Sequence, residues 1–212
     1  MTMNEGFKSA TVILILATSA VFILQLALGR GFTELFLLDS RHVFSRPWIL
    51  VTHIFLHGSF THILYNMYGL LLFGPFLEDR IGARRFFLFY ILAGIFAGFL
   101  SSFFYAKSLG ASGALMAVIG ALVILMPGLR LLFFYVIPTP LWMAGLLYAL
   151  IDAAGVLFPS GVGNIAHLAG MGAGLLYGIY LKSEKKRFNR KFSSKRHLGK
   201  EDIDEYLKSG RI

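Results

Sequence analysis

The chain has 212 residues, of which 57% are hydrophobic and only 15% are charged, and its mean hydropathy is +0.70. Soluble domains are typically about 45–50% apolar and about 25% charged, so this composition excludes a soluble α/β enzyme and a disordered chain. The absence of cysteine excludes disulfide frameworks, thiolate metal sites and cysteine nucleophiles. The formal net charge is +9, and its meaning depends on where the basic residues lie.

Six uninterrupted apolar runs organise the sequence. They cover residues 10–29, 55–77, 86–105, 111–126, 131–157 and 163–181. Because a membrane-crossing helix needs about 20 apolar residues, the runs predict an all-α polytopic membrane protein, a bundle of six transmembrane helices. The first run lacks a clear A-x-A-like cleavage site, so we expect it to be retained. The fifth contains Pro138 and Pro140, which predict a kinked or partly re-entrant segment.

The basic residues divide unequally between the two sides of such a bundle. The side that holds both termini carries sixteen Lys and Arg residues, eleven of them after residue 181, and the opposite side carries four. The positive-inside rule therefore places the N- and C-termini in the cytoplasm. We expect residues 1–181 to form one membrane domain, with residues 30–54 at the outer interface. Residues 182–212 are expected to be a basic cytoplasmic tail that contacts the lipid bilayer, so the charge implies no nucleic-acid partner.

Polar side chains inside the predicted spans mark candidate functional positions, because a bilayer penalises them. They are His57, His62, Asn66, Ser112, Asp152 and His167, with His53 just outside. The second, fourth and sixth spans all run inward from the external side. Ser112 and His167 therefore share a layer about 5–15 Å below the outer surface. The pair His62 and Asn66 lies at the same depth, and small residues at every fourth position beside Ser112 and His167 favour close helix packing.

This layer predicts a serine nucleophile with a histidine base. Serine needs an adjacent base at neutral pH, usually a neutral histidine, and His167 is in the right layer. Ser112 at the start of a helix exposes backbone N–H groups that stabilise an oxyanion, and Asn66 is a candidate further donor. No acid adjoins His167 in sequence, and Asp152 is expected toward the inner half of the fifth span, bonded to a neighbouring helix. We therefore predict a Ser–His dyad that needs no metal or organic cofactor.

Three short motifs resemble those of the rhomboid intramembrane serine proteases. Residues 110–113 (GASG) resemble the G-x-S-G motif of that family, residues 62–66 (HILYN) its H-x-x-x-N motif, and residues 166–170 (AHLAG) its A-H-x-x-G motif. Each motif alone is a weak signal, but three in this order and in the proper helices are strong. The resemblance covers roughly residues 10–181 and agrees with the six-span plan.

The resemblance implies an activity and a role for each residue. It implies a serine endopeptidase that cleaves transmembrane protein substrates near the external face, with Ser112 as the nucleophile and His167 as the general base. It also implies an oxyanion hole formed by Asn66, His62 and the backbone amide of Ser112. Substrate identity and oligomeric state do not follow from it.

The sequence departs from the family pattern in two places. Many rhomboids have an aromatic residue four positions after the serine, packed on the catalytic histidine, whereas this chain has Met116 there. A thioether can contact a ring favourably, so we expect a modest change in imidazole orientation. Arg46 and Trp48 approximate the family's Trp-Arg pair, but in a different order. Glu78 and Arg80 resemble the family's E-x-R element, which follows the second span.

Three other classes of function stay open on the sequence alone. One is a catalytically inactive rhomboid-like binder of membrane clients, against which the intact Ser112 and His167 count. Another is a haem or metal protein that uses His53 and His57, which are four residues apart as helical ligands often are. The third is a proton-coupled transporter with a relay through Asp152 and His167. Covalent reaction of Ser112 with a fluorophosphonate separates the protease from all three.

Overall fold

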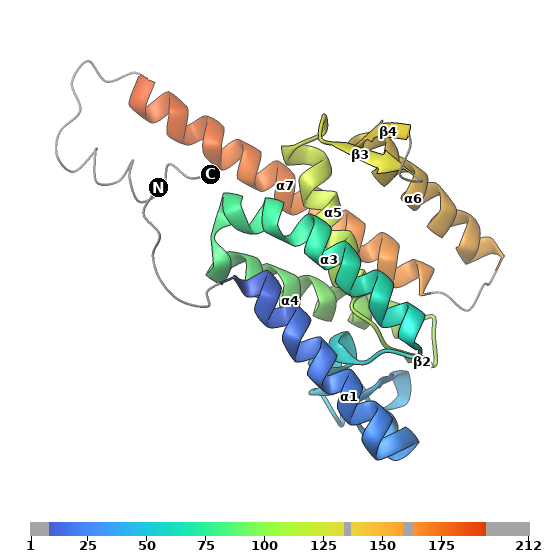
Figure 1. The fold of residues 1–212 in the computed structure, drawn as a ribbon. Helices are drawn as coiled ribbons and strands as arrows, with labels where there is room; N and C mark the ends of the chain where they lie inside the picture. The colour runs from blue at the N-terminus through green and yellow to red at the C-terminus, as the bar shows by residue number, and fades with distance from the viewer. Residues whose placement is uncertain (1–8, 134–136, 159–162, 194–212) are drawn as a thin grey trace.

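The structure, a computed structural model, describes residues 9–133, 137–158 and 163–193. Six long helices account for most of these residues: α1 (Ala10–Phe36), α3 (Phe60–Ile81), α4 (Ala83–Ser101), α5 (Ser112–Leu125), α6 (Leu141–Leu157) and α7 (Asn164–Ser193). The shorter elements are β1 (Leu38–Asp39), η1 (Ser40–His42), α2 (Ile49–Thr52), η2 (His53–Phe55), β2 (Lys107–Ser108), β3 (Arg130–Phe133) and β4 (Ile137–Pro140). The protein is thus mostly helical, as the sequence predicts (Figure 1).

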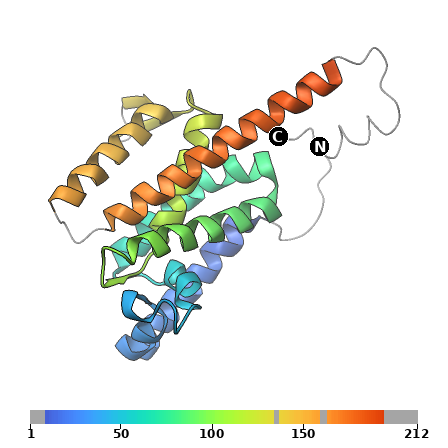
Figure 2. The ribbon, with the colours of Figure 1, turned by 180° about the vertical axis from the view of Figure 1, so that it is seen from behind.

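Helix α5 is the central element of the bundle. It contacts α3, α4, α6 and α7, and the contact with α7 is the most extensive. Every residue from Gly113 to Leu122 is buried, as expected for a helix that is apolar on all sides. Figures 1 and 2 show α7 running along α5, with α3 and α4 on one side and α6 on the other. The first residue of α5, Ser112, is therefore held within a packed set of helices.

Glycines allow α5 and α7 to approach at backbone distance. A Cβ atom added at Gly170 would overlap the carbonyl oxygen of Gly113, and one at Gly174 would overlap that of Ala117. Small residues at a four-residue period give this close approach in membrane helices. The predicted small-residue faces of the two helices therefore do contact each other.

A buried carboxylate joins α1 to α3. Glu78 accepts hydrogen bonds from the backbone N–H groups of Ala10 and Thr11, at 2.7 and 2.9 Å, and from the hydroxyls of Ser9 and Thr11, at 2.9 and 2.6 Å. The first N–H groups of a helix have no intrahelical acceptor, and an anion beside them is also attracted to the positive end of the helix dipole. Glu78 thus caps α1 and has a structural role.

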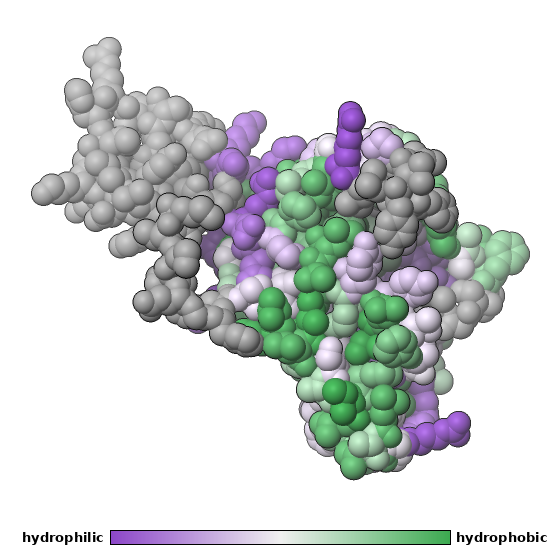
Figure 3. All heavy atoms as spheres, in the orientation of Figure 1, coloured by the Kyte–Doolittle hydropathy of each residue, from purple (hydrophilic) through white to green (hydrophobic). Residues whose placement is uncertain are grey.

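The surface of the bundle is strongly apolar. Among the described residues, α1 and α4 are long and apolar enough to cross a membrane by length and composition, and α5 and α6 are shorter apolar helices. The count of six crossings therefore stays a prediction. Figure 3 shows apolar residues over the middle of one face and hydrophilic residues toward its edges. Large exposed side chains include Leu26, Leu28, Leu71, Leu92 and Leu176, a surface that soluble monomers rarely present.

The fifth apolar run does not form one kinked helix, so the expectation of a kink is wrong, and the partly re-entrant alternative stays a prediction. Its first part belongs to an antiparallel hairpin in which β3 pairs with β4, with Arg130 opposite Pro140 and Leu132 opposite Pro138. Helix α6 begins only at Leu141, directly after Pro140. Proline lacks an N–H donor and restricts the residue before it to extended conformations, so two prolines in three residues favour a strand followed by a helix start.

The predicted boundary between membrane domain and tail lies inside one helix. Helix α7 continues from Asn164 to Ser193 without a break at residue 181. The rest of the predicted tail, residues 194–212, lies outside the described residues. The division into a membrane domain and a tail stays a prediction.

Candidate active site

The segment before Ser112 has a backbone conformation that requires glycine. Gly110 has φ +128°, and a Cβ atom there would lie 2.8 Å from the imidazole ring of His62. Its N–H donates to the carbonyl oxygen of His53 at 2.9 Å. The ring of His62 therefore lies directly over the turn that leads into α5, and only a residue without a side chain fits beneath it.

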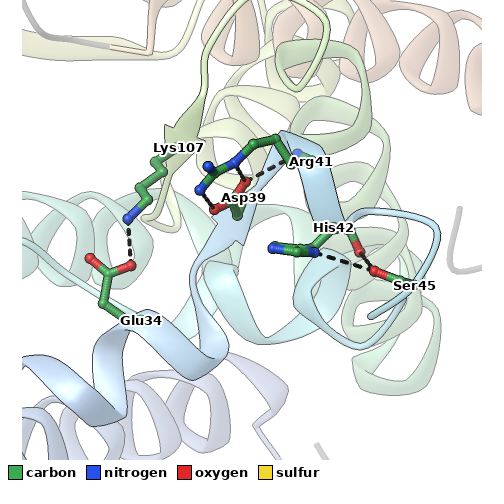
Figure 4. Close-up of polar contacts among 6 residues, drawn as sticks. All are labelled: Glu34, Asp39, Arg41, His42, Ser45 and Lys107. Atoms are coloured by element: carbon green, nitrogen blue, oxygen red, sulfur yellow. Dashed lines mark hydrogen bonds and ion pairs between the residues drawn. The ribbon is translucent and has the colours of Figure 1, made fainter.

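The loop between α1 and α3 also contacts the segment that precedes Ser112. Strand β1 pairs with β2, with Leu38 opposite Ser108 and Asp39 opposite Lys107. Figure 4 shows the ion pairs at this junction, Lys107 with Glu34 and Arg41 with Asp39. The pairing fixes the path of the chain four residues before Ser112.

The charge state of Asp39 is set by its neighbour. The Arg41 guanidinium, which donates to both Asp39 oxygens at 3.1 and 2.8 Å, holds the pKa of that carboxyl well below its usual range. A group with a depressed pKa stabilises the folded state above its unfolded pKa and loses that effect only as the pH falls toward its folded pKa. Asp39 therefore stays ionised across the neutral range, and the β1–β2 junction is not pH-sensitive there.

Ser112 and His167 meet across the α5–α7 contact. The Oγ of Ser112 and the Nε2 of His167 are 2.7 Å apart, a normal O–H···N hydrogen-bond distance. Ser112 is the first residue of α5, and His167 lies in the first turn of α7. The structure thus brings together the two residues that the sequence proposes as nucleophile and base.

The other ring nitrogen of His167 contacts a carboxylate. Its Nδ1 is 2.9 Å from Oδ1 of Asp152 on α6, and the two side chains are 13% and 8% exposed. Asp152 is bonded to a neighbouring helix, as expected, but it lies at the same end of the bundle as Ser112, so the expectation that it lies toward the inner half of its span is wrong. Helices α6 and α7 are antiparallel neighbours in the chain. Asp152, five residues before the end of α6, therefore lies beside the first turn of α7.

Asn66 and His62 lie on the same cavity as the serine. The cavity has a volume of about 1190 Å³ and is lined, among others, by His62, Asn66, Ser112 and His167. Asn66 is 4% exposed, and its Nδ2 donates one hydrogen bond to the carbonyl oxygen of His62 at 3.1 Å. Since an amide nitrogen carries two hydrogens, a second N–H is present for a ligand in the cavity.

The family comparison agrees with this geometry. The sequence model of the Rhomboid domain matches residues 45–184, a range that includes His62, Asn66, Ser112, Asp152 and His167. The chain belongs to the rhomboid family. Rhomboids are integral membrane proteins, which accounts for the apolar surface of the bundle.

Curated relatives include rhomboids from a fungus and from bacteria. The chain is 35% identical over 172 residues to Rhomboid protein 1, mitochondrial, from Saccharomyces cerevisiae, across 75% of this chain and 49% of that protein. It is 27% identical over 136 residues to rhomboid protease GlpG from Haemophilus influenzae, across 64% and 70% of the two chains. It is 38% identical over 76 residues to putative rhomboid protease YdcA from Bacillus subtilis, across 34% and 38%. This rhomboid therefore spans about half the length of the yeast relative.

Two further histidines of this rhomboid, His53 and His57, support the loop before α3. His53 is buried, and its Nδ1 lies 2.9 Å from the carbonyl oxygen of Ile49. The backbone of His57 exchanges hydrogen bonds with the side chain of Gln25 on α1, and its ring packs edge-on against that of His62. Within the described part of the chain, no group of three or more His, Asp or Glu side chains forms a candidate metal site. Gln25 is a contributor that the sequence analysis missed.

Proposed function

We propose that this rhomboid is a serine endopeptidase that cuts membrane proteins within or beside a transmembrane helix. The observation that carries the proposal is the 2.7 Å contact between Ser112 Oγ and His167 Nε2 at the wall of a large cavity. A hydroxyl becomes a useful nucleophile at neutral pH when a neutral imidazole accepts its proton. Relatives named rhomboid protease support the same chemistry.

The proposed reaction has two stages. In the first, Ser112 Oγ bonds to the scissile carbonyl carbon as its proton passes to His167 Nε2; the C–N bond then breaks, and the proton passes to the leaving nitrogen. In the second, a water molecule gives a proton to His167 and attacks the acyl carbon; the ester bond to Ser112 Oγ then breaks, the proton returns from His167 to that oxygen, and the new carboxyl end is released. Both stages pass through an oxyanion on the former carbonyl oxygen.

The donors proposed for that oxyanion are Asn66, His62 and the backbone N–H of Ser112. The first amides of α5 have no intrahelical acceptor, so they point out of the helix beside the nucleophile. Asn66 and His62 line the same cavity as Ser112. Preorganised donors of this kind typically supply the largest single part of the rate enhancement in acyl transfer.

The proposed substrates are transmembrane proteins, cleaved near the external face. The charge distribution predicts cytoplasmic termini, and with that orientation the N-terminal ends of α3, α5 and α7 face outward. The cavity lies at these ends, so water would reach the acyl-enzyme from the external side. No cofactor takes part in the proposed steps.

The test uses purified protein in detergent or lipid. A fluorophosphonate should label the wild type covalently, and Ser112→Ala should abolish both labelling and cleavage of a transmembrane substrate. His167→Ala should abolish nearly all turnover, and the double variant should be little worse because the two residues act as one unit. Cleavage by folded Ser112→Ala at the wild-type rate would overturn the proposal.

One alternative has an observation of its own. The hydrogen bond between Asp152 and His167 would also suit a proton relay, which is how a proton-coupled transporter would use these residues. A transporter has no need of a nucleophilic serine, so it predicts no covalent labelling at Ser112 and no loss of transport in Ser112→Ala. The fluorophosphonate experiment therefore decides between the two.

A further inference from the structure

Asp152 is a buried carboxylate whose side chain contacts the histidine of the proposed reacting pair. Its Oδ1 is 2.9 Å from Nδ1 of His167, on the side of the ring opposite Ser112. We propose that Asp152 is a positioning residue that completes a Ser–His–Asp triad assembled from α5, α7 and α6. This proposal rests on the proposed function, because a triad has meaning only if Ser112 and His167 react.

The packing of α6 on α7 places Asp152 at this position. A Cβ atom at Gly155 would lie 2.5 Å from Nδ2 of Asn164, so the α6 backbone lies directly against that buried side chain. Gly155 is three residues after Asp152, and Asn164 is three residues before His167, so in antiparallel helices the two pairs are adjacent turns of one contact. The close contact at Gly155 thus sets the register that aligns Asp152 with the imidazole.

The chemistry of the groups determines what Asp152 does. An ionised carboxylate can only accept hydrogen bonds, so Nδ1 of His167 must carry the proton in this contact. Nε2 is then unprotonated and accepts the hydroxyl hydrogen of Ser112, which is the arrangement that general-base catalysis requires. When His167 takes up the serine proton, the carboxylate also stabilises the imidazolium. Asp152 itself neither gains nor loses a proton.

The sharpest variant is Asp152→Asn, which keeps the shape of the side chain. An amide can donate to Nδ1, which favours the tautomer with the proton on Nε2 and leaves Ser112 without a base. In soluble triads the equivalent change lowers kcat by about 10⁴-fold. We expect a fall of about 10²- to 10⁴-fold in kcat here, with KM little changed and with a folded protein. Asp152→Glu, which keeps the acceptor, should recover part of the rate.

A second readout does not depend on activity. Nitrogen NMR of ¹⁵N-histidine-labelled protein, with the His167 signals identified by their loss in His167→Gln, reports which ring nitrogen carries the proton. We expect the proton on Nδ1 in the wild type and in Asp152→Glu, and on Nε2 in Asp152→Asn. A carboxylate that only held α6 against α7 would not control this tautomer.

The matched control is Glu78→Gln, since Glu78 is the buried carboxylate that caps α1. It should lower thermal stability but leave kcat per folded molecule and the His167 tautomer as in the wild type. Folded Asp152→Asn with wild-type kcat and a wild-type tautomer, alongside inactive Ser112→Ala, would overturn the triad alone. Active Ser112→Ala would instead overturn the proposed function, and the triad with it.

Discussion

The side-chain amide of Asn66 donates one hydrogen bond within α3 and also lines the cavity that holds Ser112. One N–H of its Nδ2 donates to the carbonyl oxygen of His62 at 3.1 Å, which fixes the side chain along α3. The same side chain lines the cavity with Ser112, where its second N–H is proposed to stabilise the oxyanion. A buried amide held by its own helix is preorganised, so it loses little freedom when the oxyanion forms.

We predict that Asn66→Ala lowers kcat by about 10²- to 10³-fold, the usual cost of one well-placed oxyanion donor. Compensation by His62 and the Ser112 amide would reduce that loss. Because the nucleophile and base are intact, the variant should still label slowly with a fluorophosphonate. Steady-state kinetics and labelling rates measure both effects. Leu64→Ala, an exposed change on the same helix, is the control, and equal rates in the two variants would exclude Asn66 from the oxyanion hole.

Glu78 and Asp152 are both buried carboxylates, but their hydrogen-bond partners give them different roles. Glu78 accepts hydrogen bonds from the start of α1, and all of its partners there are backbone amides or hydroxyls. Asp152 contacts an imidazole that also contacts a serine hydroxyl. The first arrangement stabilises a helix end, and the second can control a proton. Burial alone does not distinguish them.

At the scale of elements, the α5–α7 contact determines whether the reacting pair forms. Ser112 and His167 are 55 residues apart in sequence and belong to different helices. They meet because Gly170 and Gly174 let α7 lie against the α5 backbone one and two turns below the site. A shift of about 1 Å between these helices would lengthen the Ser112–His167 hydrogen bond beyond its useful range.

We therefore predict that Gly170→Ala lowers both stability and turnover. Its added methyl group would overlap the Gly113 carbonyl oxygen, and overpacking of this kind typically costs about 1–3 kcal/mol. The matched control is Gly172→Ala on the same helix, where nothing lies within 4 Å of the added atom. Thermal unfolding in detergent and kcat measure the two effects. Equal behaviour of the two variants would show that the close contact does not control the site.

At the scale of the whole molecule, the site lies at one end of the bundle. The cavity is lined by residues at the starts of α3, α5 and α7 and at the end of α6, the same end that carries the β1–β2 junction. The opposite end carries Glu78, which caps α1, and the basic C-terminal part of α7. If the charge asymmetry sets the orientation, the site faces the external side.

We predict that two single-cysteine variants will report this orientation. Because the sequence contains no cysteine, each variant has a single thiol that a maleimide can label. In intact cells a membrane-impermeant maleimide should label Ser45→Cys, in the loop between α1 and α3, but not Ser183→Cys, near the end of α7. Both positions are exposed, so both should react after solubilisation, which is the control. The reverse pattern would place the site on the cytoplasmic side and contradict external cleavage.

The sequence by itself determined the features that depend on local composition and spacing. Apolar runs identify membrane helices because the bilayer penalises polar side chains along the whole length of a span. The motif around Ser112 marks a serine at a helix start, and the one around His167 marks an imidazole on a helix with small residues, so these two candidates could be proposed without coordinates. The helical character and the rhomboid family were likewise predicted correctly.

Only the tertiary structure decided the contacts between elements. The pairing of β3 with β4 is a contact between two segments, and the uninterrupted apolar run through residues 131–157 gives no sign of it. The partnership of Asp152 with His167 depends on the direction of α6 and on the register fixed where Gly155 meets Asn164. An error of one residue in that register rotates a helical side chain by about 100°, enough to remove the carboxylate from the imidazole. Composition and periodicity do not specify such a register, because it is set by the shapes of two packed surfaces.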